Sequence, residues 1–183
     1  IFRSDMELPS ERSPLAQPGV DARDGDVLVS VNGRNVRNAG ELASALHHQA
    51  GQQVLLGLRR GGRDLRTVVV PVDARRNATL RYGDWVQGRI AAVEKAGEGR
   101  IGYLHLRAMG GGDMAGFVRD FYANVYRDGL IIDVRRNNGG NIDSWVLATL
   151  LRRDWAFWQA PGRTPHWNMQ QTFRGHLVVL ADT

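Results

Sequence analysis

The sequence predicts a mixed α/β protein built from two segments, a small β-rich module followed by a segment in which helices and strands alternate. Residues 26–72 contain three strand-like stretches around one helix-like stretch. Residues 83–181 alternate amphipathic helices with apolar runs, a pattern typical of strand–helix–strand units with parallel strands. No periodicity is found around residues 73–82. We therefore predict a first domain at 1–73, a linker at 74–82 and a second domain at 83–183.

In the first segment each element has a local signal. Alternating apolar and polar residues predict a strand at 26–31, and Asn32-Gly33 predicts a tight turn after it. Asn38 is a suitable N-cap for a helix over 39–50, which we expect Gly51 to end. Two further strands, 54–58 and 65–72, are expected on either side of a turn at 60–63.

The second segment reads as three helices and three strands. Asp84 and Asp113 are candidate helix caps, with the first helix ending at Gly97 and the second carrying a broad apolar stripe that we interpret as core. A third helix is expected at 142–152. The expected strands are 101–106, 130–134 and 177–181. The middle strand is almost continuously apolar, as strands buried on both faces are.

The composition excludes several classes of site. Apolar residues make up 43% of the 183 residues, enough for a sizeable core, and cysteine is absent. A disulfide scaffold, a thiolate zinc site, an iron–sulfur cluster and a cysteine nucleophile are thereby excluded. The five histidines have no metal-ligand spacing, and no serine lies in a recognisable nucleophile motif. We therefore predict no metal and no cofactor.

Charge and hydropathy limit the kinds of partner that the chain can have. The net charge is +5, carried by 23 arginines and one lysine, Lys95. The arginines are scattered and often stand beside acidic residues, whereas a nucleic-acid surface needs them gathered on one face. The apolar runs are much shorter than the roughly 20 residues of a membrane helix. We expect neither a nucleic-acid partner nor a membrane span.

The loop at 135–141 is the stretch most indicative of chemistry. It follows a buried strand and precedes a helix, and ligands of such sheets bind at the carboxyl ends of the strands. Gly139 and Gly140 allow positive φ and a close approach to a ligand, and successive amides can bind an oxyanion. A plain strand-to-helix turn is the alternative reading. Asp133 is expected to pair with a neighbouring arginine, and His105 to be a core or hydrogen-bonding side chain.

Two other stretches leave alternatives open. Residues 110–112 (GGG) resemble a phosphate loop only loosely, and a flexible or substrate-lining loop is the preferred reading. Residues 155–173 hold five of the ten tryptophans and phenylalanines in a stretch without periodicity. They form either an exposed binding surface or a satellite core.

Several motifs resemble a known family. Residues 13–20 (SPLAQPGV), 25–28 (GDVL) and 31–33 (VNG) resemble a bacterial PDZ domain. Residues 101–106 (IGYLHL) and 129–135 (GLIIDVR), with Asn138-Gly139-Gly140, resemble the catalytic core of the tricorn and C-terminal-processing (tail-specific) serine peptidases, the tricorn branch more closely. The implied fold is an α+β PDZ domain, a small β-barrel with one main helix, followed by a partial α/β crotonase-like peptidase core.

The resemblance implies a serine endopeptidase whose PDZ domain guides peptide or unfolded polypeptide to the catalytic site. By resemblance, Gly140 supplies a backbone N–H to the oxyanion hole, and Asn138, Gly139 and Gly140 bind substrate. Asn138 stands where the family often has glycine, so the donating amide is left open. We also expect Leu46 to line a peptide groove between the helix at 39–50 and a strand near 1–3, by addition of an extended peptide to a sheet edge.

The same resemblance places the catalytic histidine before the PDZ domain and the nucleophilic serine after the strand at 177–181. Because the chain begins at Ile1 and stops at Thr183, we expect a fragment that is inactive by itself and a parent protein that is an active peptidase. The alternative is a non-catalytic, peptide-binding scaffold with a degenerate peptidase core. Homo-oligomerisation of the parent is left open, and tricorn-like relatives favour the cytoplasm over the cell envelope.

Overall fold

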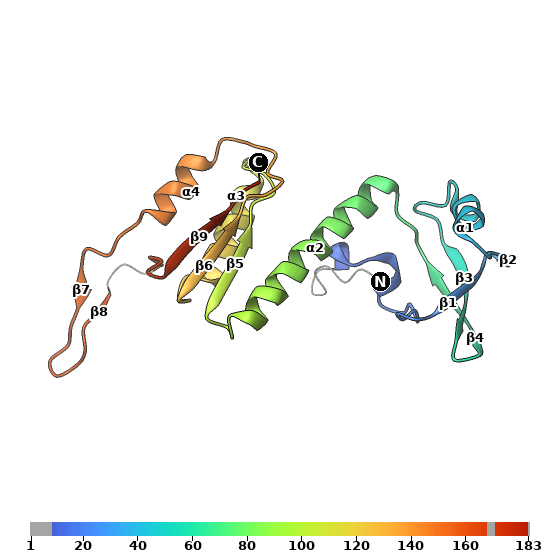
Figure 1. Cartoon of the computed structure of the whole chain (residues 1–183), viewed down its shortest axis with the longest axis horizontal. Coiled ribbons are helices and arrows are strands. Elements are labelled where there is room, and N and C mark those ends of the chain that lie inside the picture. Colours follow the sequence, from blue (N-terminus) through green and yellow to red (C-terminus); the bar gives the residue numbers. More distant parts are fainter. Residues whose placement is uncertain (1–8, 168–170, 183) are drawn as a thin grey trace. The chain divides into compact units, whose positions relative to one another are not determined.

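The structure is a computed structural model that describes residues 9–167 and 171–182. It has two compact units, Ile1–Gln87 and Gly88–Thr183, each described by itself below. Both units combine helices with a sheet (Figure 1), which confirms the predicted mixed α/β class.

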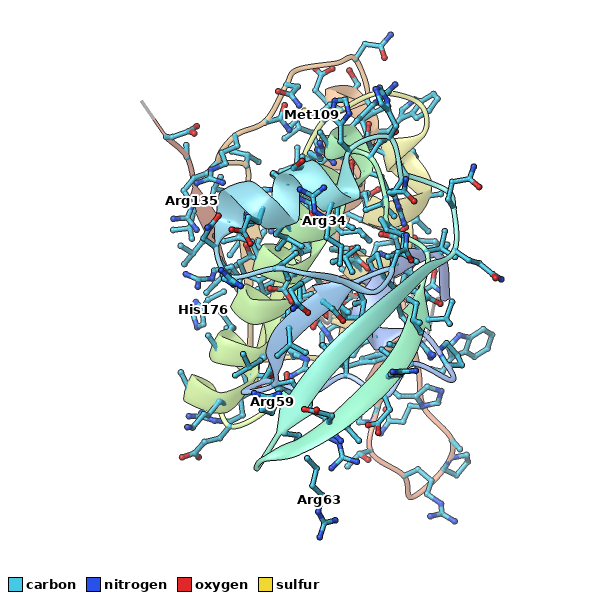
Figure 2. All side chains as sticks on the ribbon, turned by 90° about the vertical axis from the view of Figure 1, so that its right-hand side faces the viewer. Arg34, Arg59, Arg63, Met109, Arg135 and His176 are labelled. Atoms are coloured by element: carbon cyan, nitrogen blue, oxygen red, sulfur yellow. The ribbon has the colours of Figure 1, made fainter. Side chains whose placement is uncertain are left out.

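The first unit contains a four-stranded antiparallel sheet with the strand order β2-β1-β3-β4. Its strands are β1 (Val27–Val31), β2 (Arg34–Asn35), β3 (Val54–Arg60) and β4 (Arg63–Val69). Asn32 and Gly33 join β1 to β2 with φ angles of 49° and 80°, the left-handed turn expected of an Asn-Gly pair. Arg63 projects from the tip of the β3–β4 hairpin (Figure 2).

Two short 3₁₀ turns, η1 (Pro9–Glu11) and η2 (Pro14–Ala16), precede this sheet, and one helix, α1 (Ala39–Leu46), packs against it. The predicted N-cap is confirmed, because Asn38 Oδ1 accepts a hydrogen bond from Glu41 N at 2.9 Å. The predicted end of the helix is wrong. His47 leaves helical geometry with ψ 128° and His48 is left-handed with φ 59°, so the helix stops four residues before Ala50.

The segment predicted as a linker is helical. Helix α2 runs without interruption over Ala74–Ala96, through the whole of 74–82. Asp73 begins it, because its Oδ1 accepts from Arg76 N at 2.6 Å and its carbonyl accepts from Asn77 N at 2.9 Å. The cap is therefore Asp73 and not Asp84, and the two units divide inside this helix. The linker prediction failed because residues 74–82 have no apolar stripe, so the sequence showed no helical periodicity there.

The second unit contains a parallel three-stranded sheet with the order β5-β6-β9 (Figure 1). Its strands are β5 (Ile101–His105), β6 (Gly129–Asp133) and β9 (His176–Leu180). Helix α3 (Asp113–Ala123) links β5 to β6, and α4 (Asp143–Leu150) follows β6. Strand β6 pairs in parallel with both β5 and β9, which confirms the predicted strand–helix–strand arrangement.

The stripe on α3 is core, as predicted. Phe117 and Phe121 are 2% and 0% exposed and pack with the buried residues of β5 and β6. Asp113 is the first residue of α3 rather than its cap, since Gly112 takes the cap position. Strand β9 differs from the other two strands, because Val178 and Val179 are 51% and 59% exposed.

Residues 155–173 were expected to form either an exposed binding surface or a satellite core, and the structure shows parts of both. Phe173 is buried in the core of the second unit. Trp155, Phe157 and Trp158 are 74%, 56% and 61% exposed, the last two on a two-stranded hairpin formed by β7 (Phe157–Trp158) and β8 (His166–Trp167). The segment therefore exposes several aromatic side chains, while the ring of Phe173 packs in the core.

Candidate functional site

The loop between β6 and α4 lies at the carboxyl edge of the parallel sheet, beside the loop that follows β5. Met109 of the β5 loop forms a parallel β-bridge with Gly140. Met109 N donates to Gly139 O at 2.8 Å, and Asn141 N donates to Met109 O at 2.7 Å. In a parallel bridge these two bonds flank Gly140, so its own N–H and C=O point away from Met109.

Most amides of this loop are used within the fold. Five of them donate to carbonyl oxygens: Val134 N to Leu180, Asn137 N to Val134, Asn138 N to Arg107, and both Asn141 N and Ile142 N to Met109. These bonds connect the loop to the ends of β5 and β9 and to the start of α4.

Three further amides of the loop donate to side chains. Asp133 Oδ1 accepts from Arg135 N at 3.0 Å, Asp182 Oδ2 accepts from Arg136 N at 2.8 Å, and Asn137 Oδ1 accepts from Gly139 N at 2.7 Å. Eight of the nine amides from 134 to 142 thus have an acceptor, and within the described residues none is found for the amide of Gly140.

Only glycine fits at position 140. Its φ is +145°, and a Cβ built there would lie 2.1 Å from the carbonyl carbon and oxygen of Met109. Gly139 is also left-handed, with φ +79°. The positive φ expected of these two glycines is therefore present, and it brings the backbone of the two loops together.

A buried carboxylate lies at the start of the loop. Asp133, at the end of β6, is 0% exposed. Its Oδ2 accepts from the Tyr103 hydroxyl at 2.7 Å, and Arg135 binds it with Nε on Oδ1 at 2.9 Å and Nη2 on Oδ2 at 2.6 Å. The expected pairing of Asp133 with an arginine is confirmed.

The ionisation of this cluster follows from its contacts. Burial by itself would raise the pKa of Asp133, but the hydrogen bonds from Arg135 and Tyr103 outweigh it and bring that pKa to about 2. Burial, together with the hydrogen bond to Asp133, raises the pKa of the Tyr103 phenol. Asp133 is therefore a stable anion and Tyr103 a neutral donor at neutral pH.

His105 is part of the same buried region. Its side chain is 2% exposed, and its Nδ1 lies 4.0 Å from Asp133 Oδ1. Burial lowers the pKa of its imidazole, which is therefore neutral at neutral pH. Its enclosure agrees with the expectation of a core or hydrogen-bonding side chain.

The first unit has an apolar cavity of about 560 Å³. Leu46 and Leu42 of α1 line it together with Leu28 of β1 and residues from η2 and β4. That Leu46 binds a peptide stays a prediction. The expected partner strand near 1–3 lies outside the described residues.

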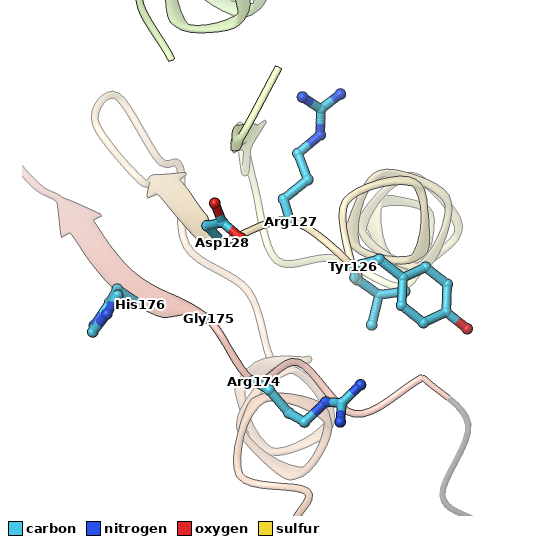
Figure 3. A pocket seen from close by; sticks show the side chains of 7 residues that line it. Tyr126, Arg127, Asp128, Arg174, Gly175 and His176 are labelled. Atoms are coloured by element: carbon cyan, nitrogen blue, oxygen red, sulfur yellow. The ribbon is translucent and has the colours of Figure 1, made fainter. Parts of the chain in front are cut away.

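A second cavity, of about 420 Å³, lies at the opposite, amino-terminal ends of β6 and β9 (Figure 3). Tyr126, Arg127 and Arg174 line it but point in different directions (Figure 3). Arg127 is held by Glu94 Oε2 at 2.7 Å, and Arg174 lies over the Trp167 ring. No convergent set of polar groups forms among these lining residues.

The described part of the chain contains neither a metal-binding cluster nor a membrane-spanning helix. No group of three or more histidine, aspartate or glutamate side chains there could hold a metal ion. None of the helices at 9–167 and 171–182 is long and apolar enough to cross a membrane.

Family comparisons match both units. The profile of the tricorn protease PDZ domain matches residues 1–73, and that of peptidase family S41 matches residues 100–183. The chain is tricorn-like. It carries a tricorn-type PDZ domain and a family S41 peptidase domain.

Several relatives agree with this assignment. Tricorn protease homolog 1 of Streptomyces coelicolor is 39% identical over 99% of this tricorn-like chain, and the tricorn protease of Thermoplasma volcanium is 30% identical over 82% of it. The crystal structure of the tricorn protease matches 98% of the chain with a TM-score of 0.82 at 26% identity. The chain spans only 18% and 14% of the two relatives and 17% of that crystallised chain.

The structure brings together part of the predicted site. Asn138, Gly139 and Gly140 share the loop after β6, whereas Leu46 lines the cavity of the other unit. Sequence reasoning missed Asn137 and Asp182, whose side chains fix the loop. A signal for Asn137 was present, since an asparagine two residues before a glycine is typical of an Asx turn.

Proposed function

We propose that this tricorn-like chain is part of a serine endopeptidase and that the Gly140 amide donates to the oxyanion formed during peptide hydrolysis. The observation that carries the proposal is the amide inventory of 134–142, in which the Gly140 N–H alone has no acceptor among the described residues. The family S41 match over residues 100–183 supports it. A crotonase-like arrangement of the whole catalytic domain is part of the proposal.

The chemistry assigned to the loop is electrostatic. When a serine Oγ attacks the scissile carbonyl carbon, the C=O electron pair moves to oxygen, and a fixed N–H stabilises the charge that develops there. The amine then leaves with a proton, and water hydrolyses the acyl-enzyme. We assign the nucleophile and the base to parts of the protein outside residues 1–183. We assign Asn138, which is exposed on the loop, and Gly139 to substrate positioning beside Gly140.

The PDZ domain is assigned to capture of peptide or unfolded polypeptide. The 560 Å³ cavity is predominantly apolar in its lining side chains, with Leu46 and Leu42 on its helical wall. Such a cavity suits an apolar side chain of an extended peptide. The proposed location of the whole protein is the cytoplasm, by analogy with tricorn-like proteins.

The test uses the full-length protein that contains this chain. We expect it to hydrolyse internally quenched fluorogenic peptides and to be labelled by a fluorophosphonate probe. Turnover should fall in proportion to the fraction of protein that the probe has labelled. The chain of 183 residues alone is expected to do neither. Turnover that survives complete exposure to the serine-directed probe would contradict a serine mechanism.

The second candidate is a non-catalytic peptide-binding protein. The apolar cavity in the first unit favours it, because binding there needs no catalytic residue. It predicts that the full-length protein binds fluorescein-labelled casein but neither cleaves it nor reacts with the fluorophosphonate.

A further inference from the structure

We propose that Asn137 is a positioning residue, whose carboxamide holds the Gly139 N–H, in the peptide unit between Asn138 and Gly139, so that the Gly140 amide alone faces the substrate. The inference rests on the function proposed above and names how the oxyanion donor is held. Asn137 itself is assigned no contact with the reacting atoms.

The carboxamide of Asn137 bonds in two directions. Its Nδ2 donates to Leu106 O at 2.7 Å, and its Oδ1 accepts from Gly139 N at 2.7 Å. Leu106 follows the last residue of β5 and is 3% exposed, so one end of the bridge is anchored in the core. The side chain therefore joins a rigid strand end to the glycine pair.

The glycine pair needs such a restraint. Glycine has access to more backbone conformations than any other residue, so ordering two in a row costs the most conformational entropy. Gly139 and Gly140 adopt φ values of +79° and +145°, two different conformations that their own backbones do not enforce. The Asn137 bridge holds the first glycine, and the bridge to Met109 holds the second.

The same bridge also selects the donor. Gly139 N and Gly140 N are adjacent amides, and either could reach an oxyanion if the peptide unit turned. With Asn137 Oδ1 on Gly139 N, that amide is occupied and its carbonyl is held by Met109 N at 2.8 Å. The Gly140 amide is then the one that remains for the substrate.

The chain offers a matched control for removal of an asparagine bridge. Asn124, at the end of α3, is half-buried as Asn137 is, and its Nδ2 donates to Asp120 O at 2.8 Å. It lies at the opposite, amino-terminal edge of the sheet. Asn124→Ala therefore removes a similar hydrogen bond far from the glycine pair.

The experiment compares Asn137→Ala, Asn137→Asp and Asn124→Ala in the full-length protein. For Asn137→Ala we expect kcat on a fluorogenic peptide to fall about 10- to 100-fold, with KM within about twofold, because a displaced donor weakens the transition state more than the bound substrate. Hydrogen exchange of a peptide covering 134–142 should become about tenfold faster. Asn124→Ala should change neither readout.

Asn137→Asp separates the two bonds. It keeps an oxygen acceptor for Gly139 N and loses the donor to Leu106, so kcat and exchange should lie between those of the wild type and Asn137→Ala. A merely structural role would instead lower the melting temperature of Asn137→Ala and leave kcat unchanged per folded molecule.

The outcomes separate this proposal from the proposed function. If the wild type is an active peptidase and Asn137→Ala alters neither kcat nor exchange, the positioning role is refuted and the peptidase function stands. If the wild type hydrolyses nothing, the oxyanion assignment fails with the proposed function. Faster exchange in Asn137→Ala would then still support the structural clamp on Gly139.

Discussion

Gly140 lies directly against Met109, so closely that a Cβ at position 140 would meet the Met109 carbonyl group at 2.1 Å. Two loops that leave neighbouring parallel strands are thereby joined at the carboxyl edge of the sheet. The contact explains why the loop after β6 cannot accept a side chain at this position.

We predict that Gly140→Ala destabilises the second unit by about 2 kcal/mol or more, since it adds both a steric clash and an unfavourable φ. In the full-length protein, kcat should fall at least about 100-fold, the effect of losing an oxyanion donor. Urea denaturation and peptide hydrolysis measure the two effects.

Gly116→Ala is the matched control for Gly140→Ala. Gly116 lies within α3, and a Cβ there meets nothing within 4 Å. Alanine in a helix interior should be neutral or stabilise by up to about 1 kcal/mol. Equal losses of stability for both variants would contradict the special role of position 140.

Asp133→Asn should destabilise the second unit by about 1–3 kcal/mol at pH 7, because it removes the anion that accepts the hydrogen bonds of Arg135, whose side chain is 38% exposed. The pKa of Asp133 is about 2 in the folded protein, below the value of about 3.9 for an unfolded aspartate. Its contribution is therefore complete above about pH 4 and is lost as the pH falls toward 2. The variant should show a smaller acid-induced loss of stability over that interval.

Asp128→Asn is a suitable comparison for Asp133→Asn, as its side chain is 66% exposed and lies 3.8 Å from Arg100. An exposed pair of this kind contributes little to stability. The free energy of unfolding of both variants is measured by chemical denaturation from pH 2 to 7. The same pH dependence for Asp133→Asn and Asp128→Asn would contradict the stabilising role of Asp133.

Arg60→Ala should destabilise the first unit more than Arg59→Ala. Arg60 joins two acidic residues, with Nε and Nη2 each 2.7 Å from Asp26 and Nη1 2.9 Å from Asp21. The hydrogen bond from Arg60 lowers the pKa of Asp26 to about 2, so the stabilisation present above about pH 4 is lost as the pH falls toward 2. Arg60→Ala should weaken this acid dependence.

Arg59 provides the control because its partner Asp64 is 70% exposed. Thermal unfolding of the two variants at pH 7 and pH 3 checks the order. A larger effect for Arg59→Ala would show that the Arg60 contacts do not hold the sheet to the loop before β1.

Leu46→Asp should reduce the binding of fluorescein-labelled casein at least about tenfold, because it places a charge on the apolar wall of the 560 Å³ cavity. Leu55→Asp, on an exposed position of β3, should leave binding unchanged. Fluorescence anisotropy measures binding, and circular dichroism confirms that both variants fold. Unchanged binding in a folded Leu46→Asp protein would exclude this cavity as the peptide groove.

The local elements were predictable where one strong signal dominates. The Asn32-Gly33 turn, the Asn38 cap and the strand at 130–134 depend on backbone conformation, a capping hydrogen bond and continuous apolar sequence, all within a few residues. Helix α2 was missed over 74–82 because its first turns carry good helix formers without an apolar stripe.

The site was predictable in part. Consecutive glycines after a buried strand indicated a close backbone approach at Gly139 and Gly140. Sequence could not tell which amide remains available, because that depends in part on Met109 and Asp182, which come from other parts of the chain. The family resemblance pointed to this loop as the source of an oxyanion donor. The hydrogen bonds of the loop support Gly140 as that donor.

By itself, the sequence determined that this is a mixed α/β chain with a small β-rich domain, a parallel sheet and a glycine loop at a strand end, since each of these follows from local pattern. The tertiary structure decided what surrounds that loop. It placed the buried Tyr103 and Asp133 and the partly exposed Arg135 in one cluster at the start of the loop, and the Met109 carbonyl against Gly140. Contacts between residues distant in the chain depend on how the strands align, which no local pattern encodes.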